Sequence, residues 1–263
     1  MEDLSGARVV VTGAGAGIGA ALARRFAAGG ARVVVNDLDA GRAAAVAAEV
    51  GGTAVPGDAS GVVGSARAAL GGGIDIFCAN AGIAPEGGPE APEEVWDAAW
   101  DVNVKAHVRA AHELLPEWLE RGSGRFISTV SAAGLLTMVG SAPYSVTKHA
   151  ALSFAEWLSV TYRHRGVEVH AVCPQGVRTD MLRGTGALGE LVLAPTAIEP
   201  EEVADAVLEA VAQGRFLVLP HPETAGHYAV RATEPDRWLH GMNQIQQKAE
   251  RHMQRNPRPK KAR

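Results

Sequence analysis

A tyrosine and a lysine stand one helical turn apart in a segment that could carry proton chemistry. Tyr144 and Lys148 lie at the start of a helical pattern, and residues four apart on a helix share a face. A phenol with a pKa of about 10 is a weak base at neutral pH. An ammonium a few ångströms away stabilises the phenolate, so we expect Lys148 to lower the pKa of Tyr144 toward the working range. The pair therefore predicts a general acid/base beside a fixed positive charge.

A serine thirteen residues before Tyr144 extends this group. Ser131 follows an apolar run, at the point where a strand is expected to end. Its hydroxyl could donate to the same substrate oxygen as the tyrosine and stabilise charge that develops there. The alternative interpretation is an exposed surface pair of tyrosine and lysine with an unrelated serine at a strand end.

The loop that follows the first apolar run contains four glycines among the eight residues from Thr12 to Gly19. A loop with so few side chains lets backbone N–H groups approach a pyrophosphate closely. The helix that opens directly behind it adds a favourable partial positive charge. Because glycines also make ordinary turns, this loop alone leaves both interpretations open.

An acidic residue, Asp37, ends the second apolar run, eighteen residues beyond Gly19. A carboxylate in this place can accept hydrogen bonds from the adenosine ribose hydroxyls of a dinucleotide. The same charge repels the 2′-phosphate of NADP, and neither Ala14 nor Ala16 in the loop offers a compensating cation. Asp37 therefore favours NAD as the cofactor, with a plain turn residue at a strand end as the alternative.

Short β-branched runs alternate with longer alanine-rich stretches along most of the chain. The predicted strands are Arg8–Thr12, Arg32–Asp37, Thr53–Pro56, Ile74–Ala79, Gly124–Val130, Glu168–Cys173 and Phe216–Leu219. The predicted helices are Gly17–Gly29, Ala40–Val50, Gly61–Leu70, Val95–Glu113, Pro143–Arg163, Glu201–Gln213 and Asp236–Arg255. This alternation predicts an α/β fold, a Rossmann-like, doubly wound sheet of seven parallel strands flanked by helices. Ligands on such a sheet bind at the carboxyl ends of the strands.

Length and composition fit one globular domain. The chain has 263 residues, of which 47% are hydrophobic and 21% charged, and its formal net charge is −4. We expect a single NAD-binding catalytic domain over residues 1–250, with a substrate loop at 180–200 and a basic, mobile tail at 251–263. The modest negative charge gives no reason to expect nucleic acid as a partner.

The cysteines, histidines and N-terminal residues indicate a reducing compartment and no metal. Cys78 and Cys173 each lie in an apolar segment and are expected to be buried thiols. The nine histidines show no ligand spacing, so no metal site is predicted. We see neither a basic leader nor an apolar stretch long enough to span a bilayer, and we expect a cytoplasmic protein without membrane contact.

Together these residues resemble the short-chain dehydrogenase/reductase family, over most of the chain up to about Pro220. The matching positions are the loop from Thr12 to Gly19, Asp58, Asn80-Ala81-Gly82, Asn103, Ser131, Tyr144 and Lys148. The resemblance implies an enzyme that moves a hydride between a secondary alcohol and a nicotinamide cofactor. Tyr144 would take the alcohol proton in oxidation and return it to the carbonyl oxygen in reduction.

The resemblance also assigns roles that spacing alone does not reveal. Asn103 would hold a water that continues a proton relay from Tyr144, and Lys148 would hydrogen-bond the nicotinamide ribose. The implied catalytic residues are Asn103, Ser131, Tyr144 and Lys148. The implied cofactor-binding residues are Gly13, Gly15, Ala16, Gly17, Ile18, Gly19, Asp37, Leu38, Asp58, Ala59, Asn80, Ala81, Gly82, Tyr144, Lys148, Pro174, Gly176, Val177 and Thr179.

Two segments depart from the family pattern. After the sixth predicted strand, Gln175 stands where many relatives have glycine, which leaves the backbone path and the substrate wall there open. The familiar ending after the last strand is replaced by residues 219–223 and the final helical stretch. Family members are usually dimers or tetramers, so we expect a homotetramer or a homodimer.

The segments expected to cover the substrate are apolar. They carry Met181, Leu182, Leu188, Leu191, Val192 and Leu193 on one side, with Arg183 as a cation, and Leu135, Leu136, Met138 and Val139 on the other. Such a pocket suits a hydrophobic cyclic or aromatic alcohol or ketone, although each of these residues could equally belong to the core or to a subunit interface. The sequence thus favours an NAD-dependent short-chain alcohol dehydrogenase or ketoreductase. The alternatives are an NADP-linked carbonyl reductase and a non-catalytic NAD-binding sensor or scaffold.

Overall fold

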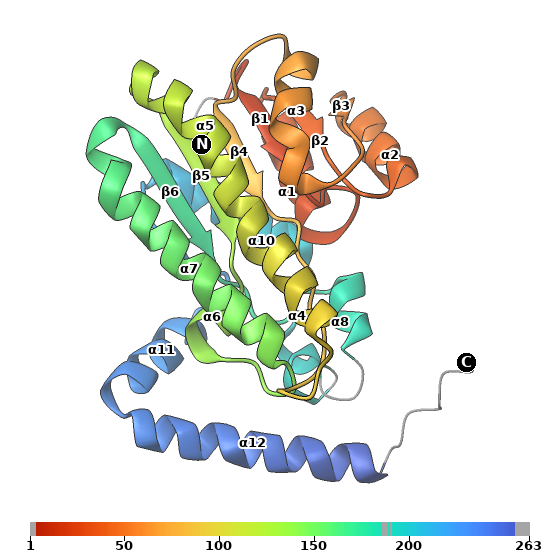
Figure 1. The fold of residues 1–263 in the computed structure, drawn as a ribbon, viewed down its shortest axis with the longest axis vertical. Helices are drawn as coiled ribbons and strands as arrows, with labels where there is room; N and C mark the ends of the chain where they lie inside the picture. Colours follow the sequence, from red (N-terminus) through yellow and green to blue (C-terminus); the bar gives the residue numbers. More distant parts are fainter. Residues whose placement is uncertain (1–3, 186–188, 190, 256–263) are drawn as a thin grey trace.

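The computed structural model of the protein describes residues 4–185, 189 and 191–255. Within these residues seven parallel strands form one sheet in the order β3-β2-β1-β4-β5-β6-β7 (Figure 1). The strands are β1 (Arg8–Val11), β2 (Arg32–Val35), β3 (Thr53–Ala54), β4 (Ile76–Ala79), β5 (Gly124–Thr129), β6 (Val167–Val172) and β7 (Leu217–Val218). The predicted Rossmann-like sheet is confirmed, and most strands end one or two residues earlier than predicted because the chain leaves the sheet there.

Helices cover both faces of the sheet. They are α1 (Gly17–Ala28), α2 (Ala40–Val50), α3 (Val62–Leu70), α4 (Glu93–Trp100), α5 (Ala106–Arg121), α6 (Ala133–Leu136), α7 (Ala142–Tyr162), α8 (Asp180–Gly184), α10 (Pro200–Ala212), α11 (Glu223–Thr233) and α12 (Pro235–Arg255). Successive side chains of β1 point to opposite faces. Val9 and Val11 pack with α1, α2 and α10, whereas Val10 packs with α3, α5 and α7.

The helix predicted from Val95 to Glu113 differs from the structure. It consists of α4, a π-helical turn from Asp101 to Lys105, and α5, which continues to Arg121. A π-turn inserts one extra residue into the helical ladder, and hydrophobic spacing alone does not reveal it. The short helices α6 and α8 and the longer α11 were not predicted either.

The order of the strands determines where a ligand can bind. β1 pairs with β2 on one side and with β4 on the other. The connections that follow these strands diverge at this point and leave a crevice beyond the carboxyl ends of β1 and β4. The glycine-rich loop after β1 and the Asn80 turn after β4 both open onto this crevice.

The C-terminal part of the chain forms a helical arm. Figure 1 shows α12, in blue, running across one end of the molecule after α11. Residues 251–255, expected in the tail, continue α12, and the rest of that tail, 256–263, lies outside the described residues, as do 186–188 and 190 of the substrate loop. Within the described chain, no helix is both long and apolar enough to cross a bilayer.

A histidine is buried between α5 and β5. His107 is 2% exposed, and its Nδ1 lies 3.0 Å from Ser128 Oγ. Burial, with a smaller contribution from the charge of Lys148, lowers the pKa of His107 to about 3. The folded protein therefore keeps this ring neutral in mildly acidic solution.

We expect this ring to make the fold sensitive to acid. In the unfolded chain a histidine has a pKa of about 6.5, so the unfolded state binds a proton first as the pH falls. The stability that His107 contributes is complete above about pH 6.5 and is lost toward about pH 3, at about 1.4 kcal/mol per pH unit. Between about pH 7.5 and about pH 5, the His107→Leu variant should lose about 2 kcal/mol less unfolding free energy in urea than the unmodified protein. Equal losses in the two proteins would contradict this assignment.

Candidate active site

A cavity of about 990 Å³ lies along the carboxyl ends of the central strands. Its walls come from the loops after β1, β2, β4, β5 and β6, from α7, and from the C-terminal helices. Of the predicted cofactor-binding residues, all but Gly15 and Gly19 line it. Ser131 also lines it, whereas Asn103 lies behind its wall.

At two positions the glycine-rich loop packs against backbone too tightly for a side chain. Gly13 has a φ of 61°, and a Cβ there would lie 2.9 Å from the Cα of Ala81. A Cβ at Gly19 would lie 2.2 Å from the carbonyl oxygen of Gly13. These glycines therefore bring the start of α1 against the loop and leave backbone exposed to the cavity.

Asp37 lies at the predicted end of the second strand and contacts the loop. One oxygen of its carboxylate accepts a hydrogen bond from Gly15 N at 3.0 Å, and the other accepts one from Asp39 N at 2.9 Å. Sequence reasoning missed Arg42, whose guanidinium lines the cavity 3.7 Å from Asp37 and 3.4 Å from Asp39. Its place in the first turn of α2, just beyond Asp37, was the signal that could have revealed this cation.

Three neighbours complete this end of the cavity. Leu38 is 77% exposed and presents an apolar surface beside Asp37. Asp58 accepts a hydrogen bond from Ser60 N at 2.7 Å, which holds the loop containing Ala59. This hydrogen bond lowers the pKa of the Asp58 carboxyl group. The pattern suits a flat aromatic group next to a polar sugar.

The Asn80 turn joins three strands at their carboxyl ends. Thr12 Oγ1 accepts hydrogen bonds from Asn80 N at 2.9 Å and Ala81 N at 3.0 Å, and donates to Cys78 O at 3.1 Å. The side-chain amide of Asn80 donates to Thr12 O at 3.0 Å and accepts from Thr129 Oγ1 at 3.0 Å. The turn thus fixes β1, β4 and β5 relative to one another.

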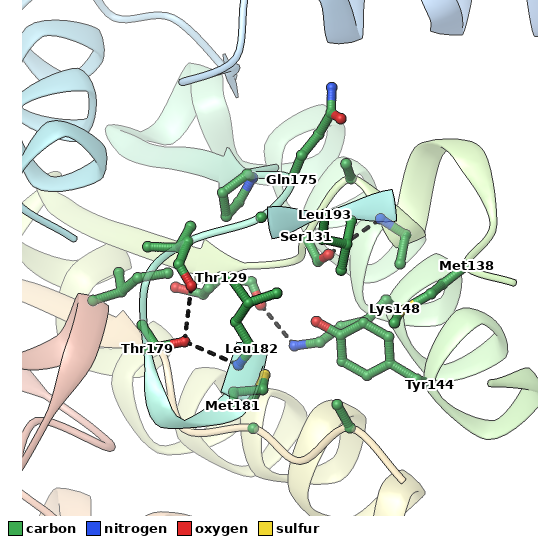
Figure 2. A pocket seen from close by; sticks show the side chains of 18 of the residues that line it. Thr129, Ser131, Met138, Tyr144, Lys148, Gln175, Thr179, Met181, Leu182 and Leu193 are labelled. Carbon is green, nitrogen blue, oxygen red and sulfur yellow. Dashed lines mark hydrogen bonds between the residues drawn. The ribbon is translucent and has the colours of Figure 1, made fainter. Parts of the chain in front are cut away.

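Three of the four predicted catalytic side chains, Ser131, Tyr144 and Lys148, converge on one part of the cavity. Figure 2 shows the hydroxyl of Tyr144 and the ammonium of Lys148 directed to the same space, near Ser131. Lys148 Nζ donates to Thr129 O at 2.8 Å and lies 5.6 Å from the centre of the Tyr144 ring. Ser131 has a φ of 80°, a strained value for a residue other than glycine, and its Oγ accepts from Ala133 N at 3.1 Å.

The charge balance differs from the sequence-based expectation. Burial raises the pKa of the Tyr144 phenol, and a hydrogen bond with Ser131 only partly opposes this rise. Burial also lowers the pKa of the Lys148 ammonium to about 8. The expected lowering of the tyrosine pKa by Lys148 is not found. Desolvation sets the direction of the shift, so the folded protein holds Tyr144 as a neutral phenol at neutral pH.

Asn103 lies in the π-helical turn and is fully buried. Its Oδ1 accepts from Ile83 N at 2.9 Å, and its Nδ2 donates to Ile83 O at 2.9 Å and to Thr147 Oγ1 at 3.1 Å. A Cβ at Gly82 would lie 3.2 Å from this Oδ1 and 3.3 Å from Lys148 Nζ, so both groups lie close to the turn. The side chain of Asn103 thus holds the cavity wall.

The loop after β6 forms the opposite rim. Thr179 Oγ1 donates to Val177 O at 3.1 Å and caps α8 by accepting from Leu182 N at 3.4 Å (Figure 2). A Cβ at Gly176 would lie 2.3 Å from Leu193 O, so this loop and the segment containing Leu193 pack backbone to backbone.

The predicted substrate-facing residues divide into two groups. The cavity is lined by Leu136, Met138, Val139, Met181, Leu182, Val192 and Leu193. Leu135 does not line it, because it packs into the core at 1% exposure. Leu191 is exposed, Arg183 pairs with Asp180, and Leu188 lies outside the described residues.

Neither cysteine lines this cavity. Cys78 and Cys173 are buried thiols, and burial raises the pKa of the Cys173 thiol to about 12. Within the described residues, no three histidine, cysteine or acidic side chains are grouped to hold a metal ion.

Comparison with known proteins places this geometry in a family. The sequence model of the short chain dehydrogenase family matches residues 7–187. The chain is 37% identical over 250 residues to the 1-deoxy-11-beta-hydroxypentalenate dehydrogenase of Streptomyces exfoliatus, with 88% of each chain covered.

Two solved structures share the fold over nearly the whole chain. A short chain dehydrogenase/reductase from Burkholderia phymatum in complex with NAD has a TM-score of 0.81 at 25% identity, covering 90% of this chain and 96% of that one. A short-chain dehydrogenase from Sphingobium yanoikuyae in complex with NADPH has a TM-score of 0.74 at 26% identity, covering 97% of each. By family match, sequence identity and fold together, the chain belongs to the short chain dehydrogenase family and is an oxidoreductase.

Proposed function

We propose that the protein is an NAD-dependent dehydrogenase or ketoreductase that interconverts a hydrophobic secondary alcohol and its ketone. The observation that carries this proposal is the convergence of Tyr144, Lys148 and Ser131 in a cavity that continues to the glycine-rich loop and Asp37. The two ends of the cavity provide acid/base groups and a dinucleotide cradle in one continuous space.

The residues present fit a nicotinamide dinucleotide. A side chain at Gly13 or Gly19 would collide with backbone, so the loop keeps its N–H groups close to the cavity. Asp37 and Asp58 would face the adenosine, the Asn80 turn the central part, and Val177 and Thr179 the nicotinamide. When bound, the cofactor supplies or accepts the hydride at its nicotinamide ring.

Proton transfer to and from the substrate oxygen is proposed for Tyr144, assisted by its neighbours in the cavity. A buried neutral phenol at Tyr144 is ready to donate its proton to a carbonyl oxygen during reduction, and in the reverse direction it must first lose that proton. Ser131 would donate a hydrogen bond to the same oxygen as charge develops on it. Lys148, fixed by Thr129 O, would hold the ribose, and Asn103 would order the relay behind it.

The substrate is proposed to be bulky and apolar. The side chains around Tyr144 in Figure 2, among them Met138, Met181 and Leu182, offer apolar surface with few charges. The Streptomyces exfoliatus relative is named for a hydroxylated compound, 1-deoxy-11-beta-hydroxypentalenate, which supports a hydroxyl-bearing substrate. Turnover of cyclic ketones with NADH or NADPH, and of cyclic alcohols with NAD⁺ or NADP⁺, tests this proposal. Binding of NADH without any turnover would instead favour the sensor or scaffold.

We also propose that the protein is a homodimer or homotetramer and that it is located in the cytoplasm. Support for association comes from apolar side chains on the outer face of α7, where Trp157 is 53% and Val160 84% exposed. Sedimentation of the purified protein measures this directly.

The preference for NAD is tested by an Asp37→Asn variant. The amide keeps an acceptor for Gly15 N but removes the negative charge, so Arg42, which then pairs with Asp39 and not with Asp37, can attract a 2′-phosphate. We expect kcat/KM with NADPH, relative to NADH, to rise about 10-fold or more.

The matched control is Asp205→Asn, which removes a carboxylate paired with Arg25 outside the cavity and should leave the cofactor preference unchanged. If the Asp37 variant keeps the cofactor preference of the unmodified protein, the repulsion argument is wrong. A wild-type preference for NADPH would favour the NADP-linked carbonyl reductase, for which Arg42 is the supporting observation.

A further inference from the structure

The C-terminal helix α12 supplies an outer wall of the cavity. Trp238, Met242 and Ile245 line it, and their spacing of four and three residues places them on one helix face. Ala249 continues this face at 1% exposure, whereas Leu239 on another face is 63% exposed. One face of α12 therefore lines the cavity, and Leu239 on another face is exposed to solvent.

The first turn of α11 is attached to the loop after β6 through one residue. Gln175 N donates to His221 Nδ1 at 3.2 Å. The side-chain amide of Gln175 donates to Thr224 Oγ1 at 3.0 Å and to Glu223 Oε1 at 3.3 Å. Thr224 is fully buried, and Figure 2 shows the Gln175 side chain directed away from Tyr144.

Two further contacts position α11, one with α6 and one with α12. Arg231 Nη1 donates to Leu135 O at 2.5 Å, which holds the far end of α11 on α6. The rings of His227 and Trp238, one from each C-terminal helix, lie 6.0 Å apart between centres. The position of Trp238 at the cavity therefore depends on where α11 is held.

Gln175 lies between the proposed cofactor side of the cavity and the wall that the C-terminal helices form. Its chain neighbours Pro174 and Gly176 line the cavity on the proposed cofactor side. Glycine, which the family pattern places at this position, has no side-chain amide and could keep only the bond to His221. The glutamine side chain thus adds two hydrogen bonds, both to the first turn of α11.

We propose that Gln175 is a positioning residue that holds α11, and through it α12, as the outer wall of the substrate site. On that wall Trp238, Met242 and Ile245 select for bulky apolar substrates. That α12 contacts a substrate rests on the proposed function, whereas the attachment of the helices does not.

Hydrogen exchange measured by mass spectrometry on the full chain tests the attachment. The Gln175→Ala variant loses two hydrogen bonds, so backbone amides of residues 223–245 should exchange about 10-fold faster, while those of β1 and β4 stay unchanged. The matched control is Gln213→Ala, which removes a side-chain amide bonded to Glu209 on the surface and should leave residues 223–245 as they were. Equal exchange in Gln175→Ala and the unmodified protein would overturn the proposal.

Steady-state kinetics test the selectivity with two ketones, the bicyclic 2-decalone and the smaller cyclohexanone. Both Gln175→Ala and Trp238→Ala should raise KM for 2-decalone about 5- to 10-fold, with kcat and the KM for cyclohexanone within about two-fold. A loss shared equally by both ketones, or one confined to kcat, would overturn the selectivity. Turnover of neither ketone would contradict the proposed function and the selectivity with it, while the exchange result still decides whether Gln175 holds α11.

Discussion

Replacing Tyr144 with phenylalanine is expected to lower turnover about 10²- to 10⁴-fold, in both directions, while NADH binding stays within about two-fold. The ring remains to fill its buried place, but the hydroxyl that would exchange a proton with the substrate oxygen is gone. Stopped-assay kinetics and NADH fluorescence titration measure the two quantities separately.

The chain offers a matched control at the other end of the same helix. Tyr162 packs edge-on against Trp157, 5.7 Å between ring centres, and does not line the cavity. Tyr162→Phe should therefore keep full activity. An unchanged rate in Tyr144→Phe would reject this residue as the acid/base, and a rate lost together with NADH binding would show that the phenol acts by holding the site.

A methyl group at Gly19 is expected to weaken NADH binding about 10- to 100-fold. The new Cβ would lie 2.2 Å from Gly13 O and 2.7 Å from the Asn80 amide nitrogen, and real side chains do not tolerate such distances. The loop must shift, which misaligns the N–H groups that would bind the pyrophosphate. Isothermal titration with NADH measures the loss.

Gly64→Ala is the control for this change. Gly64 is exposed in α3 with nothing within 4 Å of its absent Cβ, so alanine there should leave NADH binding unchanged and raise stability by up to about 1 kcal/mol. If Gly19→Ala binds NADH as tightly as Gly64→Ala does, close packing at the loop is not what forms the cradle.

The sheet and the two ends of the cavity were predictable because local patterns encode them. Runs such as Val9–Val11 bury both faces of a strand, and the glycines from 13 to 19 and the Tyr144–Lys148 spacing are recognisable over a few residues. The same local logic placed Asp37 beside the loop, where Gly15 N contacts it.

What sequence reasoning missed depends on contacts between distant segments. The π-turn at 101–105 has no hydrophobic signature, and Leu135 belongs to the core because α6 turns it inward. Gln175 was visible only as a departure, since its partners lie 46 to 49 residues further along the chain. Arg42 belongs to α2 and not to the glycine-rich loop, and only the fold brings its guanidinium beside Asp37.

The charge of Tyr144 was misjudged for a related reason. Spacing reveals that a lysine is near the phenol, but the free energy of removing both groups from water depends on the whole cavity. Burial raises the pKa of Tyr144 and lowers that of Lys148, so each group resists its charged form. The folded protein therefore favours a neutral phenol at Tyr144, beside a Lys148 ammonium that loses its proton more readily than an exposed lysine does.

The most direct test is a crystal structure of the protein with NADH and a slowly reduced cyclic ketone. We predict the ketone oxygen within hydrogen-bond distance of both the Tyr144 hydroxyl and Ser131 Oγ, with the carbonyl carbon facing the nicotinamide ring. A phenol hydroxyl turned away from the ketone, or a nicotinamide bound elsewhere than beside Tyr144, would contradict the account.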